Sequence, residues 1–306
     1  MKLTVIGADA STWDLLDPTS PVTLTGGIKG LHVPTVSGVW SDTAAGDSRR
    51  RRGRVVAPRQ VVMKVHVGDL VGTYRDGVDW LPADSAWWTA LGGGETPFTL
   101  QLDLERLDAL GRPDVRHLVL WDESEDDGYD VDPSGPGSQD YVVQASPESP
   151  WWAGPTVTAR FAYNPVAAAN YYGGSTGLGP PFVISAGSQF RNAAIPNPGQ
   201  RPAWLEYRVI APFGYAEVGV GAGDRVVPLP FSQVAGQQVV IVTDPRRRSI
   251  TDGAGTNLWP LLAPGLEPLF DPVPPGASVP LHVRLDDAAL GAAVEVSLVP
   301  EYRRGW

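Results

Sequence analysis

Alternation of apolar and polar residues recurs along the whole chain and predicts β-strands with one buried face. The clearest run is 61–67, where every second residue is apolar and Lys64 and His66 lie between. Because turn-forming residues separate these short runs, the pattern indicates a β-sandwich or barrel. Further strands are expected at 3–6, 100–105, 117–121, 141–143, 182–184, 204–210, 217–220 and 239–242. The strand at 117–121 and the strand at 141–143 are expected to form a hairpin.

The C-terminal part of the chain shows the same pattern after a Pro274-Pro275-Gly276 turn. Residues 281–285 and 294–298 each carry apolar side chains at alternate positions. A Pro-Pro-Gly turn fixes one φ angle and supplies a permissive glycine, so it predicts a hairpin of these two strands. This hairpin would complete a β-sandwich and leave an aromatic and basic tail at its end.

One short helix is expected among the strands. Asp84 or Ser85 can cap it, residues 86–91 form its turns, and Gly92 with the two glycines that follow ends it. Residues 146–155 are rich in serine and proline and are typical of a linker. The sequence therefore predicts an all-β protein with one short helix, divided into domains at 1–155 and 156–306.

Composition agrees with a folded chain that is rich in turns. Of the 306 residues, 42% are hydrophobic and 11 are tryptophan, with 35 glycines and 30 prolines spread between the apolar runs. No stretch approaches the roughly 20 apolar residues that cross a bilayer, and residues 1–6 read as a strand rather than a signal peptide, so no membrane insertion is expected. The chain contains no cysteine, which excludes disulfides and agrees with assembly in a reducing cytoplasm.

The net charge of −10 lies entirely in residues 1–155, whereas 156–306 are neutral overall. Seven carboxylates fall within 122–132, between two expected strands. A calcium loop that starts at Glu123 would have its glycine at the sixth position, but Ser134 stands where a bidentate acid is needed. A solvated turn is the simpler interpretation. The acidic residues singled out here are Asp122, Glu123, Glu125, Asp126 and Asp127.

Two stretches together resemble the distal tail (Dit-like) proteins of long-tailed siphophages, often described as minor tail proteins in phages of actinobacteria. The first runs from Leu24–Leu31 through a polar, basic loop to the expected strand at 59–67 and the segment 80–91. The second spans 192–306. Its motifs are Asn197-Pro198-Gly199, Gly236–Pro245, Phe270–Gly276 and Val294–Trp306. They cover most of the chain in the same order and spacing.

The resemblance implies an N-terminal β-sandwich or split-barrel domain that forms a hexameric ring, followed by a galectin-like β-sandwich. It implies that the ring joins the tail tube protein to the tail-tip hub protein of the baseplate, near the tape measure protein, while DNA passes through the centre. The implied location is the tail tip of the virion, after assembly in the host cytoplasm. No cofactor is implied. In such a ring the acidic hairpin is a candidate for the lumen, where negative charge lets DNA slide without binding.

Four consecutive arginines, Arg49, Arg50, Arg51 and Arg52, lie in an expected polar loop at 42–53. Basic runs can bind nucleic acid, but this domain is acidic and no aromatic residue interleaves with the run. A contact with acidic residues of a neighbouring subunit or an adjoining tail protein is therefore favoured over DNA binding. An ordinary exposed loop is the remaining alternative.

Tyr171, Tyr172, Trp204 and Tyr207 are candidates for a platform that stacks on a host cell-wall sugar, although core packing explains them more simply. The four histidines are far apart in sequence, so metal and acid–base roles are not expected. The chain has no nucleophile elbow, P-loop or His-Glu-x-x-His motif. The sequence thus predicts a structural virion protein, not an enzyme. A carbohydrate-binding module that recognises host cell-wall glycan is the alternative, and a wall-degrading enzyme is least favoured.

Overall fold

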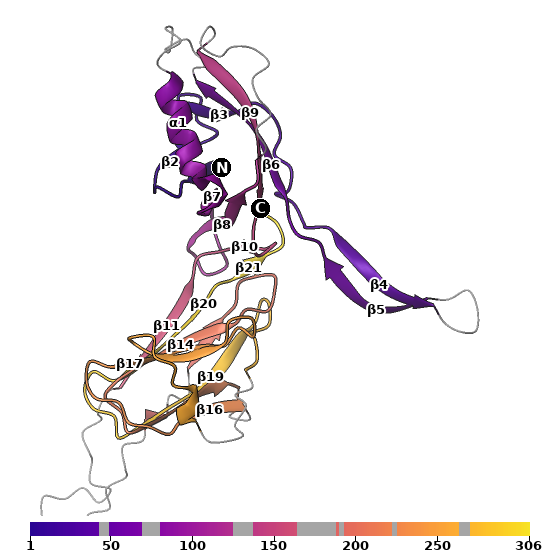
Figure 1. Ribbon diagram of the computed structural model, residues 1–306. Coiled ribbons are helices and arrows are strands. Elements are labelled where there is room, and N and C mark those ends of the chain that lie inside the picture. The colour runs from indigo at the N-terminus through magenta and orange to yellow at the C-terminus, as the bar shows by residue number, and fades with distance from the viewer. Residues whose placement is uncertain are drawn as a thin grey trace, which may run out of the picture. The chain divides into compact units, whose positions relative to one another are not determined.

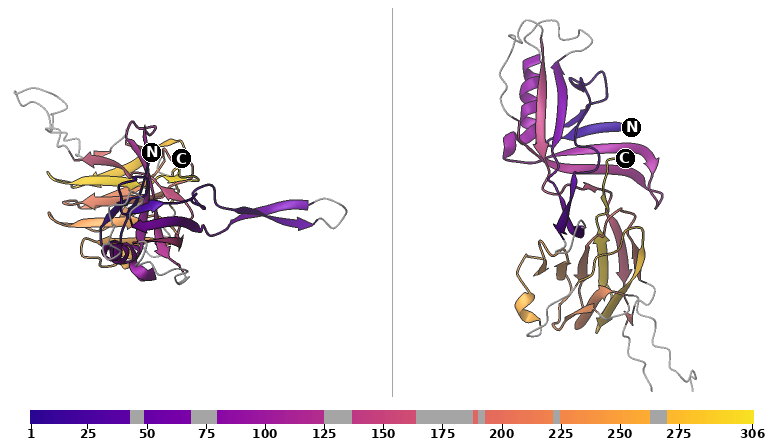
Figure 2. Two further views of the ribbon diagram at one scale, coloured as in Figure 1. Left: turned by 90° about the horizontal axis from the view of Figure 1, so that it is seen from above. Right: turned by 90° about the vertical axis from the view of Figure 1, so that its right-hand side faces the viewer.

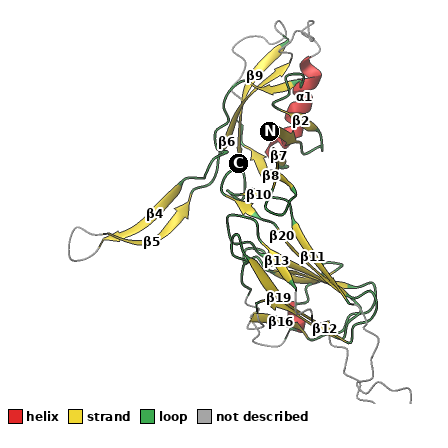
Figure 3. Ribbon diagram, turned by 180° about the vertical axis from the view of Figure 1, so that it is seen from behind, coloured by secondary structure: helices red, strands yellow, loops and turns green. Residues whose placement is uncertain are grey.

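The computed structural model describes residues 1–42, 49–68, 80–124, 137–163, 188–189, 193–221, 225–262 and 270–306. Strands dominate these residues, as Figure 3 shows, and a single α-helix lies among them, so the prediction of an all-β fold is confirmed. The contacts divide the chain into two compact units. The first comprises Met1–Pro155 and Glu301–Trp306, and the second comprises Thr156–Pro300.

The first unit is built on a nine-stranded sheet (Figure 1). Its strands are β1 Lys2–Ile6, β2 Thr12–Asp14, β3 Val22–Leu24, β6 Val61–Gly68, β7 Phe98–Leu107, β8 Pro113–Asp122, β9 Ser138–Ser146, β10 Trp152–Ala153 and β21 Glu301–Tyr302. The main path runs β2-β1-β7-β8-β9-β6-β3, and β10 pairs with both β8 and β21. Neighbouring strands are antiparallel throughout.

Leu15 links the two ends of this sheet and nearly closes it into a barrel. Its backbone N–H donates to the carbonyl of Leu3 on β1 at 2.9 Å, and its own carbonyl accepts from the N–H of Leu24 on β3 at 3.0 Å. The apolar face predicted for β6 fills the interior, because alternate side chains of a strand point to the same face. Its four members are fully buried: Val61, Met63, Val65 and Val67.

The α-helix of the first unit, α1 (Trp80–Leu91), packs against β6. Its buried side chains lie on one face, and Trp87 meets the ring of Trp13 edge-on at 5.9 Å. The helix ends where the sequence predicts, at Gly92, which begins the short 3₁₀ turn η1 (Gly92–Gly94). Gly92 has φ +76°, and a Cβ there would lie 2.5 Å from Thr96 Oγ1, so only glycine fits.

The helix begins at Trp80, earlier than the predicted start at 86. Pro82 lies in its first turn, where proline is tolerated because the first backbone N–H groups have no partner within a helix. Asp84, one of the two expected caps, is inside the helix. Its carboxylate instead accepts a hydrogen bond from the hydroxyl of Tyr141 on β9 at 2.6 Å.

A separate two-stranded sheet consists of β4 (Val36–Asp42) and β5 (Arg49–Val56), and it pairs with no other described strand. Figures 1 and 2 show this hairpin standing clear of the nine-stranded sheet. The prediction that the four arginines lie in a polar loop is wrong, because they form the first half of β5. A run of identical polar residues carries no alternation signal, and pairing with β4 imposes the extended backbone.

The predicted hairpin of 117–121 with 141–143 also needs correction. Strand β9 pairs with β6 over residues 138–145, and β8 pairs mainly with β7. Strands β8 and β9 share only two residue pairs, Trp121 with Ser146 and Asp122 with Ala145. Strands β8 and β9 are therefore neighbours only over these two residue pairs. Beyond them, β8 continues along β7 and β9 continues along β6.

The second unit contains two sheets with the orders β11-β20-β14-β17-β18 and β12-β19-β15-β16, and β13 pairs with β19. A 3₁₀ turn, η2 (Trp259–Leu261), follows β18. The strands are β11 Val157–Ala162, β12 Ser188–Gln189, β13 Ala194–Pro196, β14 Leu205–Ile210, β15 Tyr215–Val220, β16 Arg225–Leu229, β17 Gln238–Val242, β18 Ser249–Asp252, β19 Ser278–Asp286 and β20 Ala293–Leu298.

One hydrophobic core joins the two sheets, so the second unit is a β-sandwich. It contains Tyr207, Ile241 and Val296 from the first sheet and Val218 and Val283 from the second. The apolar faces predicted at 281–285 and 294–298 are both buried in it. However, β19 and β20 lie in different sheets, so the predicted hairpin of these strands is wrong.

The six C-terminal residues belong to the first unit, whereas the domain boundaries predicted from the sequence include them in a second domain at 156–306. The physical reason is a strand pairing that the sequence does not reveal: β21 pairs with β10, with Tyr302 opposite Trp152. The second unit is therefore inserted between two strands of the first. Among the described residues, no helix is both long enough and apolar enough to cross a membrane.

Candidate functional site

Hairpin β4–β5 displays the predicted arginines on an exposed ribbon. Arg49–Arg52 are all exposed, and Arg52 Nε donates to Ser41 Oγ at 2.8 Å. A register shift within the ladder places Trp40 opposite Arg51. Trp40 is 55% exposed. An aromatic side chain therefore lies among the arginines. It comes from the opposite strand, so the arginine run in the sequence does not reveal it.

The chemistry of this hairpin suits contact with an acidic partner. Guanidinium groups bind carboxylates through two parallel hydrogen bonds, and exposed apolar side chains add contact area. Val55 on β5 and Val36 on β4 are also exposed, at the other end of the same hairpin. In the part of the chain that the structure describes, no third strand pairs with β4 or β5, and the edge of such a ribbon can form further backbone hydrogen bonds. The hairpin is thus a candidate interaction surface.

The C-terminal tail is held in the first unit by two buried arginines, and we call Tyr302–Trp306 with these two arginines the C-terminal clasp. The first is Arg59, which is only 3% exposed. Its guanidinium donates to four backbone carbonyls, and burial lowers the pKa of Arg59 to about 10. The acceptors are Pro150 at 2.8 Å, His32 at 2.6 Å, Arg303 at 3.1 Å and Gly30.

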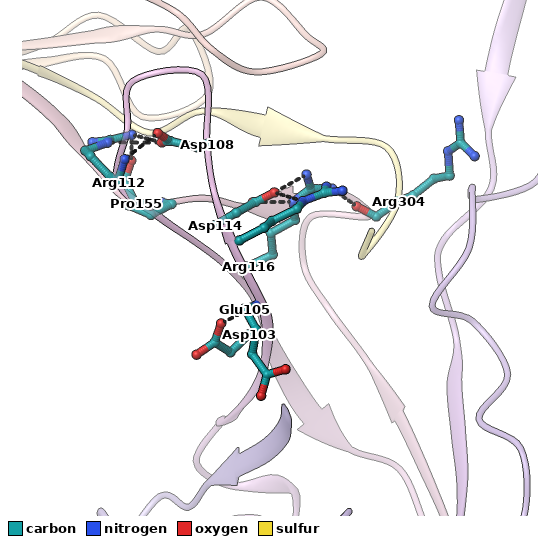
Figure 4. A network of polar contacts seen from close by, with 9 residues as sticks. Asp103, Glu105, Asp108, Arg112, Asp114, Arg116, Pro155 and Arg304 are labelled. Carbon is teal, nitrogen blue, oxygen red and sulfur yellow. Dashed lines mark hydrogen bonds and ion pairs between the residues drawn. The ribbon is translucent and has the colours of Figure 1, made fainter. Parts of the chain in front are cut away.

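Arg116 on β8 is the second arginine of the clasp (Figure 4). It forms a two-pronged ion pair with the buried Asp114, with both N–O distances at 3.0 Å. It also donates to the carbonyl of Arg304 at 2.9 Å, and its Cζ lies 4.0 Å from the ring centroid of Tyr302. Arg106 Nε also donates to Asp114 Oδ2, at 3.0 Å. Arg116 therefore joins β8 to the tail by charge and by a cation–π contact.

The last residues of the clasp close over the interior of the sheet. Gly305 donates its N–H to the carbonyl of Leu31 at 3.1 Å, and a Cβ on Gly305 would lie 2.9 Å from Leu102. Trp152, fully buried, donates from Nε1 to the same carbonyl at 3.2 Å. The clasp depends on contacts between residues far apart in the sequence, so no local sequence motif predicts it.

Figure 4 also shows Asp108 and Arg112 in the turn between β7 and β8. Burial opposes ionisation of Asp108, but hydrogen bonds from the N–H groups of Arg112 and Leu110 and from the Arg112 guanidinium outweigh it and lower the pKa of Asp108. Arg112 Nη2 lies 2.8 Å from the carboxylate and 3.3 Å from the carbonyl of Pro155. This turn therefore fixes the end of the first unit's long N-terminal segment.

We expect the change Asp108→Asn to weaken the first unit at neutral pH and to reduce its sensitivity to acid. The unfolded carboxyl, with a pKa near 3.8, binds protons more readily than the folded one. The stabilisation that the Asp108 carboxylate gives to the folded state is therefore fully present above the unfolded pKa. It is lost as the pH falls through the lower pKa of the folded state. Thermal unfolding at neutral pH and at about pH 3 measures the difference in Tm. Glu95→Gln, which alters an exposed carboxylate, is the control, and an equal pH dependence in wild type and Asp108→Asn would contradict the assignment.

The acidic segment is only partly within the described residues. Asp122 Oδ1 accepts from the N–H and hydroxyl of Ser124 at 3.1 and 2.6 Å. Glu123 is exposed and accepts from Ser146 Oγ at 2.6 Å. These two carboxylates therefore stabilise the local turn. Three further candidates, Glu125, Asp126 and Asp127, lie outside the described residues.

Of the four aromatic residues proposed as a sugar platform, the structure describes Trp204 and Tyr207. Tyr207 is fully buried in the sandwich core, and burial raises its pKa. A buried ring cannot stack on a sugar, so the structure excludes Tyr207 from such a platform. Trp204 is half-buried, and Tyr171 and Tyr172 lie outside the described residues.

The histidines are dispersed. His66 lies 2.7 Å from Asp140, and His282 lies 3.0 Å from Glu217. His32 meets Trp306 edge-on at 5.7 Å. In the ranges that the structure describes, no group of three or more His, Asp or Glu side chains is placed to hold a metal ion.

No protein-family model and no curated protein matches the chain. The Dit protein of phage SPP1, described as a paradigm of the hub adsorption apparatus in phages that infect Gram-positive bacteria, has a TM-score of 0.57 and 13% identity over 98% of both chains. A chain of the phage P2 baseplate in its activated conformation with calcium has a TM-score of 0.52 and 12% identity over 98% of this chain and 97% of that one. The strontium form gives 0.52 and 11% over 97% of each. The resemblance expected from the sequence is therefore confirmed for the fold: along nearly its whole length, the chain has the fold of these phage Dit and baseplate proteins.

Proposed function

We propose that this chain is a structural component at the distal end of a long, non-contractile phage tail. The observation that supports this most strongly is the agreement of fold with the SPP1 Dit protein and the P2 baseplate chain over 97% or more of each chain. Agreement of such extent includes both units and the order in which they occur. A lone binding module or an enzyme domain would match only part of such proteins.

In this proposal, copies of the chain close into a hexameric ring between the tail tube protein and the tail-tip hub protein, near the tape measure protein. DNA passes through the ring, and the second unit takes the place of a galectin-like sandwich at 156–300. The protein is assembled into the tail in the host cytoplasm. Its role is structural and involves no catalysis. The net charge of −10 supports passage of DNA, because a negative lining repels phosphates. Asp122 and Glu123 are the described residues of the segment proposed to face the lumen.

The hairpin β4–β5 is proposed to contact a neighbouring copy. Its arginines are exposed on a ribbon that pairs with no other described strand, while residues 1–155 as a whole carry all of the net negative charge. The positive charge of the hairpin is opposite to the net negative charge of residues 1–155, and this favours association of one copy with the next. In this contact the hairpin of one copy would bind the rest of the first unit of another copy. The two surfaces differ, so the contact is head-to-tail, which is the type of interface that closes into rings.

We expect Arg50→Ala combined with Arg51→Ala to weaken the ring. Native mass spectrometry of the wild-type protein should show particles of about six copies, the number in the proposed closed ring. The double variant should shift the population towards smaller species, and more strongly at higher salt because screening weakens the remaining charge contacts. Arg208→Ala combined with Arg247→Ala removes the same charge from exposed positions of the second unit and serves as the control.

Two outcomes would contradict separate parts of this proposal. A wild-type protein that remains a monomer or dimer, alone and with tail-tube and hub proteins present, would exclude the ring. An unchanged particle mass in the double variant, together with lost binding of duplex DNA, would assign the arginines to nucleic acid instead of a neighbouring copy.

A further inference from the structure

The sandwich of the second unit carries a polar cluster on the outer face of the β15–β19 pair. Alternate residues of these strands, including Val218 and Val283, point into the core. The residues between them point outward, and Glu217 lies directly opposite Arg284 in the ladder. We call this set the β15–β19 cluster: Tyr215, Glu217, His282, Arg284 and Asp286.

Members of the β15–β19 cluster hold one another in fixed positions. Both carboxylate oxygens of Glu217 are engaged, one by the Tyr215 hydroxyl at 2.6 Å and one by His282 Nε2 at 3.0 Å. Arg284 binds Asp286 through two N–O contacts, at 3.0 and 2.7 Å. All five side chains are half-buried, so they are ordered by their neighbours yet still reach the surface.

The charges within the cluster are also fixed. Burial opposes ionisation of Glu217, but hydrogen bonds from Tyr215 and His282 and the charge of Arg284 outweigh it and lower the pKa of Glu217. Burial and the hydrogen bond to Glu217 raise the pKa of Tyr215 to about 12, so its hydroxyl keeps its proton. A pre-organised surface of this kind loses little conformational entropy when it binds a ligand.

The cluster has hydrogen-bonding capacity that its own members do not use. Arg284 Nη1 lies 3.8 Å from Glu217 Oε1, which is too far for a direct hydrogen bond. A single hydroxyl placed above this gap could accept from the guanidinium and donate to the carboxylate, at about 2.8 Å from each. Nδ1 of His282 has no hydrogen-bond partner among the described residues and becomes an acceptor when Nε2 carries the proton.

From this geometry we propose that the outer face of the β15–β19 pair binds a neutral saccharide through its hydroxyl groups. Each sugar hydroxyl is both a donor and an acceptor, and the cluster presents both kinds of group side by side. Glu217 and His282 accept and Arg284 donates, and the Arg284 guanidinium is itself positioned over the Tyr215 ring, with Cζ 5.8 Å from the ring centroid. The site does not include Trp204 or Tyr207.

The same chemistry argues against other ligands. Glu217 and Asp286 place two carboxylates beside one guanidinium, so a phosphate or sulfate group would meet net negative charge. An apolar peptide would leave the charged groups without water or partners, which is costly. A neutral polyol avoids both penalties.

This proposal concerns the second unit and does not depend on the ring. The test uses the full-length protein on an array of neutral oligosaccharides built from hexoses, deoxyhexoses and N-acetylhexosamines, with sulfated and phosphorylated forms beside them. Wild-type protein should bind at least one neutral saccharide, and titration calorimetry with that saccharide should show binding about tenfold weaker or more in Glu217→Gln and in Arg284→Met.

The matched control is an ion pair on the outer face of the other sheet, where Arg160 lies 3.1 Å from Glu295. Arg160→Met and Glu295→Gln should leave the affinity unchanged. Thermal unfolding of all four variants shows whether each one is folded, and Tyr215→Phe provides a second test that removes only one hydroxyl. Three results would overturn the proposal: no saccharide bound by the wild type, a preference for the anionic forms, or equal affinity in folded Glu217→Gln and Arg284→Met. Native mass spectrometry of the same samples reports on the ring separately.

Discussion

A chain that ends at Pro300 is expected to lose the fold of its first unit while its second unit stays folded. The truncation removes β21, the buried side chain of Tyr302 and two carbonyl acceptors of the C-terminal clasp. Loss of a buried aromatic side chain alone costs about 3–5 kcal/mol, which is comparable with the whole stability of many domains. Calorimetry of the wild type should show unfolding of both units, and the truncated chain should keep only the transition of the second.

Ending the chain after Gly305 is the control for this experiment. Trp306 is 46% exposed. Its removal keeps the pairing of β21 with β10, and it keeps the carbonyl groups of Arg303 and Arg304 that accept from Arg59 and Arg116. We expect Tm of the first unit to change little. If the chain that ends at Pro300 instead kept a cooperative transition of the first unit with unchanged Tm, residues 301–306 would not contribute to the stability of that unit.

Arg59→Met is expected to destabilise the first unit by about 3 kcal/mol or more, because it leaves several buried carbonyls without a donor. The wild-type guanidinium reaches acceptors from three separate parts of the chain, around residues 30, 150 and 303. Methionine has a similar length but no donor, so the change tests the hydrogen bonds more than the volume. Urea unfolding measures the loss.

Arg54→Met on the exposed face of β5 is the comparison for Arg59→Met, and we expect it to change the free energy of unfolding by less than about 0.5 kcal/mol. Burial already disfavours the charge of Arg59, as its lowered pKa shows. In the described structure the hydrogen bonds of Arg59 offset this cost, because they join three segments that are far apart in the sequence. Equal stability of the two variants would contradict this role.

Much of the fold follows from short-range pattern. The alternating apolar residues of β6 and of 281–285 are buried as expected because a strand repeats every two residues, so its sequence alone identifies the inner face. Gly92 ends the helix and Gly276 lies in the turn before β19, both as predicted, with φ of +76° and +68°. These features depend only on residues close together in the chain, and such features can be deduced from a single sequence.

The features that the sequence did not reveal depend on distant partners. Arg49–Arg52 are a strand because β4 pairs with them, and Trp40 reaches the arginines only across that ladder. Strands β19 and β20 follow one another in sequence yet pair with different neighbours. The clasp joins Arg59 to Arg303 across the length of the chain. No local pattern specifies such pairings, which is why the candidate surfaces were identified in part and the clasp was missed.

The position of the insertion has an evolutionary consequence. The chain leaves the first unit after β10 and returns in β21, and Ala153 lies opposite Glu301 in that ladder. The two exchange points are therefore about 5 Å apart, the spacing of adjacent strands. A recombination event that replaced everything between them would leave every hydrogen bond of the host barrel in place. Such an architecture can acquire a new appendage, and with it a new specificity, without any change to the scaffold that carries it.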